Sequence, residues 1–314
     1  MKRGLSRVLL LSLALPGAVA LAESRMEKTL KLDPGNEFII DTDLGRVTVT
    51  GASASGVRLV VTSRRELDDL LHFEYEEGSG RAMVRARKKH SDWGFFSDGG
   101  SNVRFEIEVP AQTTVRVHTS GGAISLSGTR APANLHTSGG GIEVRGLQGD
   151  LEANTSGGSI SIRDIRGKAR VETSGGGIDA FNVEGTLQAE TSGGSIHTDR
   201  ITGDMRVHSS GGGIHIREAG GKVEADTSGG SIDAEFSRGN SRGGSLESSG
   251  GGITVAVDPS VGLAIDARGN SVSSDVPLTV QGEFSRGSLR GNLGSGGERL
   301  HLRTSGGSVK IRSL

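Results

Sequence analysis

The chain has 314 residues, among them 52 glycines, 6 prolines and no cysteine. The lack of cysteine excludes disulfides, thiolate metal sites and a lipid anchor attached through cysteine. A formal net charge of −1 provides no basic excess that would attract nucleic acid or an anionic membrane, so we expect no nucleic-acid partner.

Residues 1–22 predict a secretory signal peptide. The segment opens with basic residues, residues 8–15 form an apolar run too short to span a bilayer, and residues 20–22, Ala-Leu-Ala, provide a small-x-small cleavage site. We therefore expect an exported protein, periplasmic or extracellular, whose mature chain begins at Glu23. No other long apolar segment follows, so we expect no transmembrane segment after signal cleavage. The alternative is that the segment remains as an uncleaved anchor.

Residues 23–118 predict an irregular N-terminal β region. Apolar and polar residues alternate in several runs, such as residues 47–49 and 103–109, and this alternation is the period of a β-strand. The best helical candidate, residues 64–71, covers only about two turns. Because the open end of a solenoid exposes unpaired strand edges, we interpret this region as a β cap that continues into the repeats.

Residues 91–100 hold the only tryptophan and two of the eight phenylalanines, in a loop rich in Gly, Asp and Ser. Exposed together, Trp93, Phe95 and Phe96 would form a binding site for a sugar or a protein partner. Folded back, they would close the end of the solenoid. We favour the closing role and keep the three residues as candidate binding residues.

Residues 119–258 predict a regular repeat of 18 residues. A Thr-Ser-Gly-Gly motif begins at residue 119 and recurs, with Thr or Ser first, at 137, 155, 173, 191, 209 and 227. Glycine falls every nine residues, and each unit of nine reads Gly-x-h-x-h, where h is apolar. Such a unit predicts one short strand with one buried face, followed by a turn in which glycine supplies positive φ. Two units per coil predict an all-β, two-sided β-solenoid with about 18 residues per coil and an irregular N-terminal β cap.

The fifth position of the repeat leaves one alternative open. It alternates between glycine and serine, as at Gly141, Ser159, Gly177 and Ser195, so the true coil could contain 36 residues. We favour 18, because the apolar pattern already closes within that length.

Residues 259–314 predict an irregular segment followed by a closing coil. The period breaks after Ser231, the motif returns three residues late at 248–253, and residues 259–296 fit no repeat. Residues 300–311 restore the motif and predict the last coil of the stack.

The order of these features resembles a bacterial family of β-strand-repeat proteins known as putative adhesins, which carry a domain of unknown function. The resemblance rests on the Thr-Ser-Gly-Gly ladder and on residues 45–49, 107–110, 115–121 and 289–294. It covers nearly all of the mature chain. It implies a β-solenoid of the cell envelope or exterior, and it brings no catalytic residues to this sequence.

Residues 18 apart form outward columns, and most of these columns predict a solvated face. One column reads Asp150, Lys168, Thr186, Asp204 and Lys222. Its opposite charges would lie about 4.8 Å apart, as cross-strand pairs. The turn lacks the aspartate of calcium-binding solenoids. The adjacent Thr and Ser of the motif point in different directions, which disfavours the flat face of an ice-binding solenoid.

One column carries more specific chemistry, and its members are Asp179, His197, His215 and Asp233. Two histidines between two carboxylates can hold Zn²⁺ or change charge near neutral pH. Because a flat sheet converges ligands poorly, we keep the column as a candidate pH-sensitive or metal site and commit to no metal. His118 and His136 form a second, weaker pair.

Together these observations predict an exported, non-enzymatic β-solenoid that acts as an adhesin-like or cell-envelope scaffold and binding protein, without a cofactor. Its partner would be an unidentified envelope component, a glycan or a protein. The alternative is a polysaccharide-processing β-helix enzyme, which a groove lined by convergent carboxylates would favour. A polymerising cytoskeletal solenoid is disfavoured, because such proteins are cytosolic and this chain carries an export signal.

Overall fold

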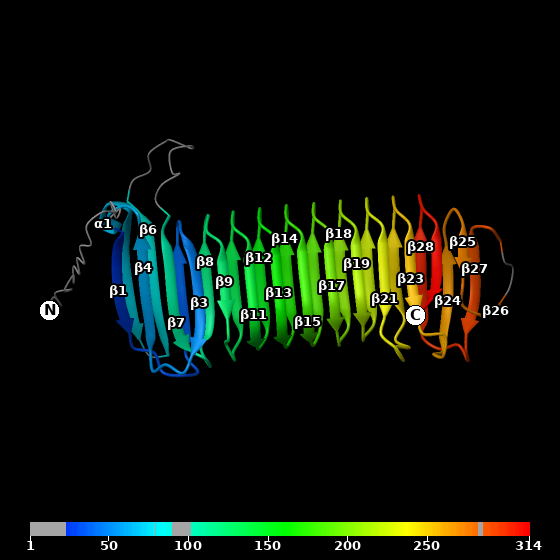
Figure 1. Cartoon of the computed structure of the whole chain (residues 1–314), viewed down its shortest axis with the longest axis horizontal. Helices are drawn as coiled ribbons and strands as arrows, with labels where there is room; N and C mark the ends of the chain where they lie inside the picture. The colour runs from blue at the N-terminus through cyan, green and yellow to red at the C-terminus, as the bar shows by residue number, and fades with distance from the viewer. Residues whose placement is uncertain (1–22, 79, 90–101, 282–284) are drawn as a thin grey trace, which may run out of the picture.

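The chain folds into two long β-sheets that face each other and run along the same long axis (Figure 1). The computed structural model describes residues 23–78, 80–89, 102–281 and 285–314. Sheet A has 14 strands and sheet B has 15, and the one helix within the described residues is α1 (Leu67–Leu70). The predicted all-β, two-sided β-solenoid is therefore confirmed.

Each regular coil contributes one strand to each sheet. In sheet A these strands are β9 (Ile124–Ser127), β11 (Ile142–Gln148), β13 (Ile160–Arg166), β15 (Ile178–Glu184), β17 (Ile196–Ile201), β19 (Ile214–Ala219), β21 (Ile232–Phe236) and β23 (Ile253–Val257). In sheet B they are β8 (Thr114–Thr119), β10 (Ala133–Thr137), β12 (Leu151–Thr155), β14 (Ala169–Thr173), β16 (Leu187–Thr191), β18 (Met205–Ser209), β20 (Val223–Thr227) and β22 (Gly244–Ser248). Neighbouring coils pair in parallel, Ile142 with Ile160 and Leu151 with Ala169. This offset confirms the 18-residue coil and excludes the 36-residue alternative.

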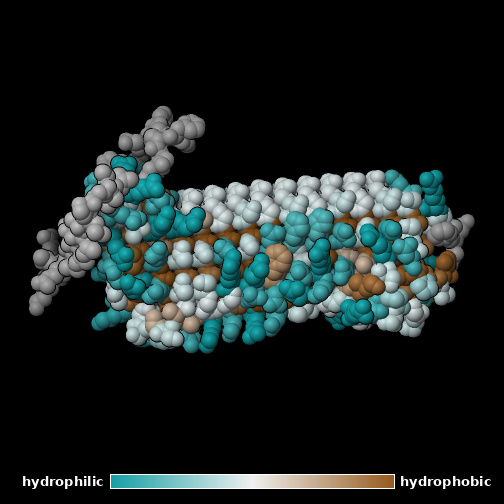
Figure 2. Space-filling model, viewed as in Figure 1, coloured by the Kyte–Doolittle hydropathy of each residue, from teal (hydrophilic) through white to brown (hydrophobic). Residues whose placement is uncertain are grey.

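The space between the sheets is filled by the inward residues of each strand. The first inward position of sheet A is isoleucine in every coil from Ile124 to Ile253, and these side chains are almost fully buried. Burial alternates along each strand, so that Ile160 points inward and Ser161 points outward. On the face in view, Figure 2 shows the apolar residues as brown stripes between rows of polar side chains.

A column of buried hydroxyl groups runs along the Thr-Ser-Gly-Gly turns. The Oγ1 of Thr155 donates to the carbonyl oxygen of Gly140 in the previous coil (2.7 Å) and accepts from the N–H of Gly158 (3.3 Å). The same two contacts recur at Thr137, Thr173, Thr191, Ser209, Thr227, Ser248 and Thr304. A buried hydroxyl needs such partners, which explains the recurrent Thr or Ser.

The prediction that the motif glycines supply positive φ is wrong for these turns. Among the described residues, none of the glycines in the Thr-Ser-Gly-Gly turns has a positive φ. Their second glycine instead lies against the backbone of the previous coil, and a Cβ at Gly158 would collide with the carbonyl oxygen of Gly140. Close stacking of backbones therefore requires glycine here. Figure 2 shows the turns as a pale ridge along one long edge, because their exposed residues are serine and glycine.

The second connection of each coil contains a left-handed residue. Equivalent positions of four successive coils hold non-glycine residues at φ between 50° and 57°: Asp164, Asn182, Arg200 and Glu218. A left-handed conformation costs an L-residue about 1–2 kcal/mol. The residue that follows each of them is apolar and fully buried, as at Ile165. We infer that this burial offsets the cost of the turn.

The N-terminal end of the stack leaves the repeat pattern. β2 (Glu37–Thr42) and β3 (Arg46–Ala52) form a coil that pairs with β8 and β9. Beyond it lie β6 (Arg81–Lys88) and β5 (Leu71–Gly78) in sheet B, and β7 (Arg104–Pro110), β4 (Val57–Ser63) and β1 (Ser24–Leu30) in sheet A. The edge strands β1 and β5 pair antiparallel with their neighbours and carry exposed charged residues, which discourage pairing with another chain.

At the C-terminal end, the strands do not stack in the order in which they follow one another in the sequence. β28 (Arg299–Thr304) pairs with both β22 and β24 (Leu263–Arg268), and β29 (Val309–Ser313) pairs with both β23 and β25 (Val272–Ser274). β27 (Ser288–Leu293) and β26 (Leu278–Val280) continue outward from β24 in antiparallel order. The last coil of the sequence therefore lies inside the stack (Figure 1). The irregular segment covers the edge that this coil would otherwise expose.

Candidate functional site

The outer face of sheet B carries a groove of about 740 Å³ that crosses seven neighbouring strands, from β8 to β20. Its walls are two columns of outward side chains, one that includes Asp150 and one that includes Glu152. Its floor lies between these columns and is formed by the small exposed part of apolar residues such as Leu151 and Leu187. Because equivalent residues repeat at the strand spacing of about 4.8 Å, the groove runs parallel to the solenoid axis.

Several charged side chains of the groove have partners along its walls. Arg206 Nε lies 3.0 Å from Glu224 Oε2, and Lys222 Nζ lies 2.8 Å from Glu224 Oε1. Hydrogen bonds, first from Lys222 and then from Arg206, lower the pKa of the Glu224 carboxyl. Arg170 Nη1 donates to Gln188 Oε1 at 3.0 Å. Arg206 and Glu224 form a cross-strand ion pair of the kind that the sequence predicts. Lys222 and Glu224 instead pair within one strand, and Lys168 contacts Asp150 through its backbone N–H.

The histidine column lies on the outer face of sheet A, where Asp179, His197, His215 and Asp233 occupy equivalent positions on four neighbouring strands. The rings of His197 and His215 stack with centroids 5.0 Å apart and planes 6° apart. His197 Nδ1 lies 3.3 Å from Asp179 Oδ1. The four side chains line a second groove of about 700 Å³, which they share with Phe181.

The geometry of this column does not fit a metal ion. Parallel stacked rings direct their nitrogen lone pairs along parallel lines, whereas zinc needs ligands that converge in a tetrahedron. In the part of the chain that the structure describes, no group of three or more His, Asp or Glu side chains could hold a metal ion. The pH-sensitive role of the column stays a prediction. His118 and His136 stack in the same way, with centroids 4.9 Å apart.

Sequence reasoning missed a Ser-His-Asp contact on sheet B. His208 Nδ1 lies 2.5 Å from Asp226 Oδ1, and Ser210 Oγ lies 3.5 Å from His208 Nε2, which is the connectivity of a catalytic triad. The 18-residue period could have revealed it, because His208 and Asp226 are one coil apart. The backbone N–H groups of Ser210, Gly211 and Gly212 all donate within the protein, so they form no oxyanion hole. We therefore interpret the contact as polar surface packing.

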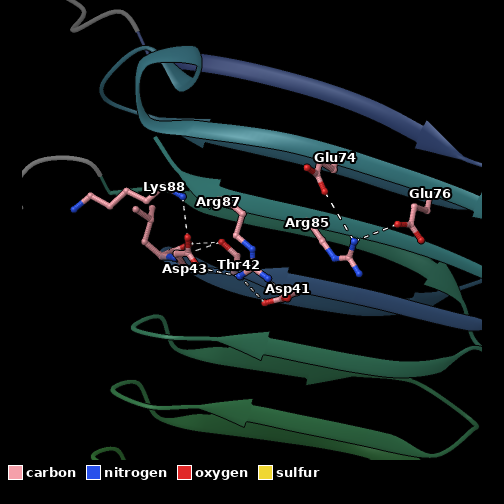
Figure 3. Close-up of polar contacts among 9 residues, drawn as sticks. Asp41, Thr42, Asp43, Glu74, Glu76, Arg85, Arg87 and Lys88 are labelled. Atoms are coloured by element: carbon pink, nitrogen blue, oxygen red, sulfur yellow. Dashed lines mark hydrogen bonds and ion pairs between the residues drawn. The ribbon is translucent and has the colours of Figure 1, made fainter. Parts of the chain in front are cut away.

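An ion-pair network ties the N-terminal strands of sheet B together (Figure 3). The guanidinium of Arg87 on β6 contacts Asp41 and also Asp43, the latter at 2.9 Å. These hydrogen bonds, first that of Asp43, raise the pKa of Arg87. Arg85 on the same strand lies beside two glutamates of β5. Since both arginines join neighbouring strands, we assign the network a structural role at the cap.

Trp93, Phe95 and Phe96, in the segment between β6 and β7, lie outside the described residues. The expected signal peptide, residues 1–22, lies outside them as well. The choice between a closing and a binding role for the three aromatics stays a prediction. Within the described ranges, no helix has the length and apolar character needed to cross a membrane.

Two unclosed parallel sheets, an 18-residue coil and axial grooves define the protein as a β-solenoid with accessible outer faces. The chain belongs to the Toastrack DUF4097 family, whose model matches residues 36–312. No curated protein matches the chain.

Several solved structures are similar to this chain. A putative adhesin from Parabacteroides merdae is 9% identical with a TM-score of 0.39, over 93% of this chain and 96% of that one. A putative cell adhesion protein from Clostridium sporogenes is 10% identical with a TM-score of 0.26, over 93% and 100%. A putative lipid binding protein from Parabacteroides distasonis is 11% identical with a TM-score of 0.32, over 93% and 97%. At these values, what the neighbours are named for does not transfer to this chain.

Proposed function

We propose that this protein is an exported, non-enzymatic binding protein of the cell envelope, adhesin-like in its role, and that the groove on sheet B holds its ligand. The groove carries the proposal, because it presents polar side chains across seven strands without interruption. Export, to the periplasm or the exterior, is supported by the sequence of residues 1–22. A long, shallow surface of this kind suits an elongated partner better than a small molecule, which prefers an enclosed pocket.

The chemistry of the groove disfavours the alternative of a polysaccharide-processing enzyme. A carboxyl that acts as general acid needs a raised pKa. The pKa of Glu224 is instead lowered by its contacts with Lys222 and Arg206. Glu152, the other carboxylate on this wall of the groove, accepts a hydrogen bond from Asn134 Nδ2 at 2.7 Å. Incubation of the purified protein with linear polysaccharides should release no product, and turnover would overturn the non-enzymatic proposal.

The binding role is tested with isolated cell envelopes and two double variants. Arg170→Ala with Gln188→Ala removes a pair from the groove on sheet B, and Glu143→Ala with Arg145→Ala removes an ion pair from sheet A. All four side chains lie on the surface, so both variants should melt like the wild type. We expect only the sheet B variant to lose envelope binding. Equal loss in both variants, or no binding by the wild type, would reject the proposal.

Export has a separate test. N-terminal sequencing of the protein from fractionated cells should find Glu23 as the first residue, in the periplasm or the medium. An intact N-terminus in the cytosolic fraction would contradict the proposed localisation.

A further inference from the structure

The groove on sheet B continues into two further grooves. It shares Arg206 and Glu224 with a groove of about 590 Å³. That groove shares Ser245, Glu247 and Arg303 with a third, of about 300 Å³, which reaches β24. Together they form one surface, the sheet B track, which crosses ten neighbouring strands from β8 to β24. At a strand spacing of about 4.8 Å, the track is about 43 Å long.

Charges of both signs alternate along the track and nearly cancel. The backbone N–H of Lys168 donates to Asp150 Oδ1 at 2.9 Å, and three coils further on the N–H of Lys222 donates to Asp204 Oδ1 at 2.8 Å. A polymer with a single sign of charge would therefore meet attraction and repulsion in turn. The lining thus favours a ligand without net charge.

The hydrogen-bonding groups of the track are of both kinds. A guanidinium offers five N–H donors and a carboxylate offers about four lone-pair sites, so one contact leaves most of this capacity unused. Arg170, for example, uses Nη1 for Gln188 and places Nη2 4.0 Å from Glu172. A hydroxyl group both donates and accepts, so a ligand rich in hydroxyls can bond to either kind of group at every position.

Other elongated ligands fit the track less well. An extended peptide binds by adding to the edge of a sheet, whereas the track lies on a face whose backbone groups already pair between strands. The peptide's own N–H and C=O groups would then lack backbone partners. An acyl chain offers no hydrogen-bonding groups, so along its length it would take the charged and amide side chains of the groove walls out of water without giving them partners.

We propose that the ligand of the sheet B track is a linear, uncharged polysaccharide that lies parallel to the solenoid axis. The inference rests on the proposed binding function and names its ligand class. Equivalent side chains recur about every 4.8 Å along the track. A polymer of repeating sugar rings can therefore make similar contacts in coil after coil, and its affinity grows with its length.

The test uses the mature protein and linear oligosaccharides, from disaccharide to decasaccharide, in uncharged, acidic and basic series of several linkages. Immobilised series identify the ligand, and calorimetry measures its affinity. We expect binding to an uncharged series, with an affinity at least about tenfold higher for the decasaccharide than for the disaccharide, since one or two added hydrogen bonds supply that factor. Added salt should change this affinity little, because no charge is screened.

Variants place the ligand on the molecule. Arg170→Ala should weaken binding of the decasaccharide by roughly tenfold, the worth of a hydrogen bond to a charged group. The matched control, Arg145→Ala on sheet A, should leave it unchanged. Absence of binding in every series, binding of acidic oligosaccharides that salt abolishes, or affinity independent of length would each overturn the inference.

The outcomes also separate this inference from the function it rests on. If envelope binding depends on sheet B but disappears when the envelopes are treated with protease, the binding function stands and the polysaccharide is wrong. If the wild type binds no envelope at all, the binding function itself fails.

Discussion

At the scale of single residues, the two glycines of each motif have different roles. A Cβ at Gly158 would collide with the backbone of the previous coil, whereas the nearest atom to a Cβ at Gly157 would be the Gly139 carbonyl oxygen at 3.4 Å. Gly158→Ala should therefore cost about 3 kcal/mol, as overpacking against rigid backbone does. Gly157→Ala should change the free energy of unfolding little. Urea denaturation followed by circular dichroism measures both, and equal losses would contradict the stacking argument.

The buried hydroxyl column makes a second prediction at this scale. Thr173 Oγ1 donates to Gly158 O at 2.7 Å and accepts from the N–H of Gly176 at 3.3 Å. Thr173→Val keeps the shape but leaves both backbone groups without this partner, so it should cost about 1–3 kcal/mol. Thr173→Ser is the control, because Ser209 makes the same contacts in a later coil. A neutral Thr173→Val would show that the column does not stabilise the turns.

The sequence revealed which residues recur in these turns, but not why. Thr and Gly at fixed positions predict a turn, and the turn is present. The contact that demands glycine at position 158 joins two coils, so it is not visible in the local sequence. The same holds for Arg200 and Glu218, whose left-handed conformation no residue propensity would suggest.

At the scale of elements, the edge strand β5 makes the cap sensitive to alkaline pH. Burial raises the pKa of Tyr75 to about 12, from about 10 in an unfolded chain. The folded chain thus holds the phenol proton more tightly. Its stability should be unaffected below the unfolded pKa and should fall as pH rises towards the folded pKa.

This prediction is measured by thermal unfolding across the alkaline range. Tyr75→Phe should remove the part of the fall that belongs to this phenol and leave the part that other groups cause. Because Tyr75 is the only tyrosine, ultraviolet absorbance of the wild type reports its ionisation directly. An ordinary tyrosine titration in the folded protein would contradict the burial of this side chain.

For the aromatic segment between β6 and β7, the sequence supports two hypotheses: the aromatics close the end of the solenoid, or they bind a partner. If Trp93, Phe95 and Phe96 close the end of the solenoid, Trp93→Ala should lower the melting temperature and leave envelope binding per folded molecule unchanged. We expect this result, since a narrow solenoid has few other large residues to cover its end. Unchanged melting with lost binding would instead make the aromatics a functional site.

Which elements exist was easier to predict than how they join. Alternation at residues 103–109 predicts the strand that became β7. The same local pattern cannot say that β7 pairs antiparallel with β4 and parallel with β3, because pairing depends on residues far away in the chain.

At the scale of the whole molecule, the regular part of the fold follows from the repeat and the ends do not. A period of 18 residues places equivalent residues of successive coils next to one another, so the pairing register of β9 to β23 could be predicted from the sequence. The placement of strands β24 to β27 could not, because these strands pass the last coil and cover its edge from outside. The sheet B track was not predicted for a related reason. The groove forms only between neighbouring columns of outward side chains, and a single column in the sequence does not reveal it.

The most direct test of the account is carboxyl footprinting of the protein bound to isolated envelopes, by carbodiimide labelling and mass spectrometry. The account predicts that bound protein is protected from labelling at carboxylates along the sheet B track, such as Glu152 and Glu247. Glu143 and Asp233 on sheet A should be labelled as in the free protein. Protection of the sheet A carboxylates alone, or equal protection of both faces, would contradict the claim that sheet B is the binding surface.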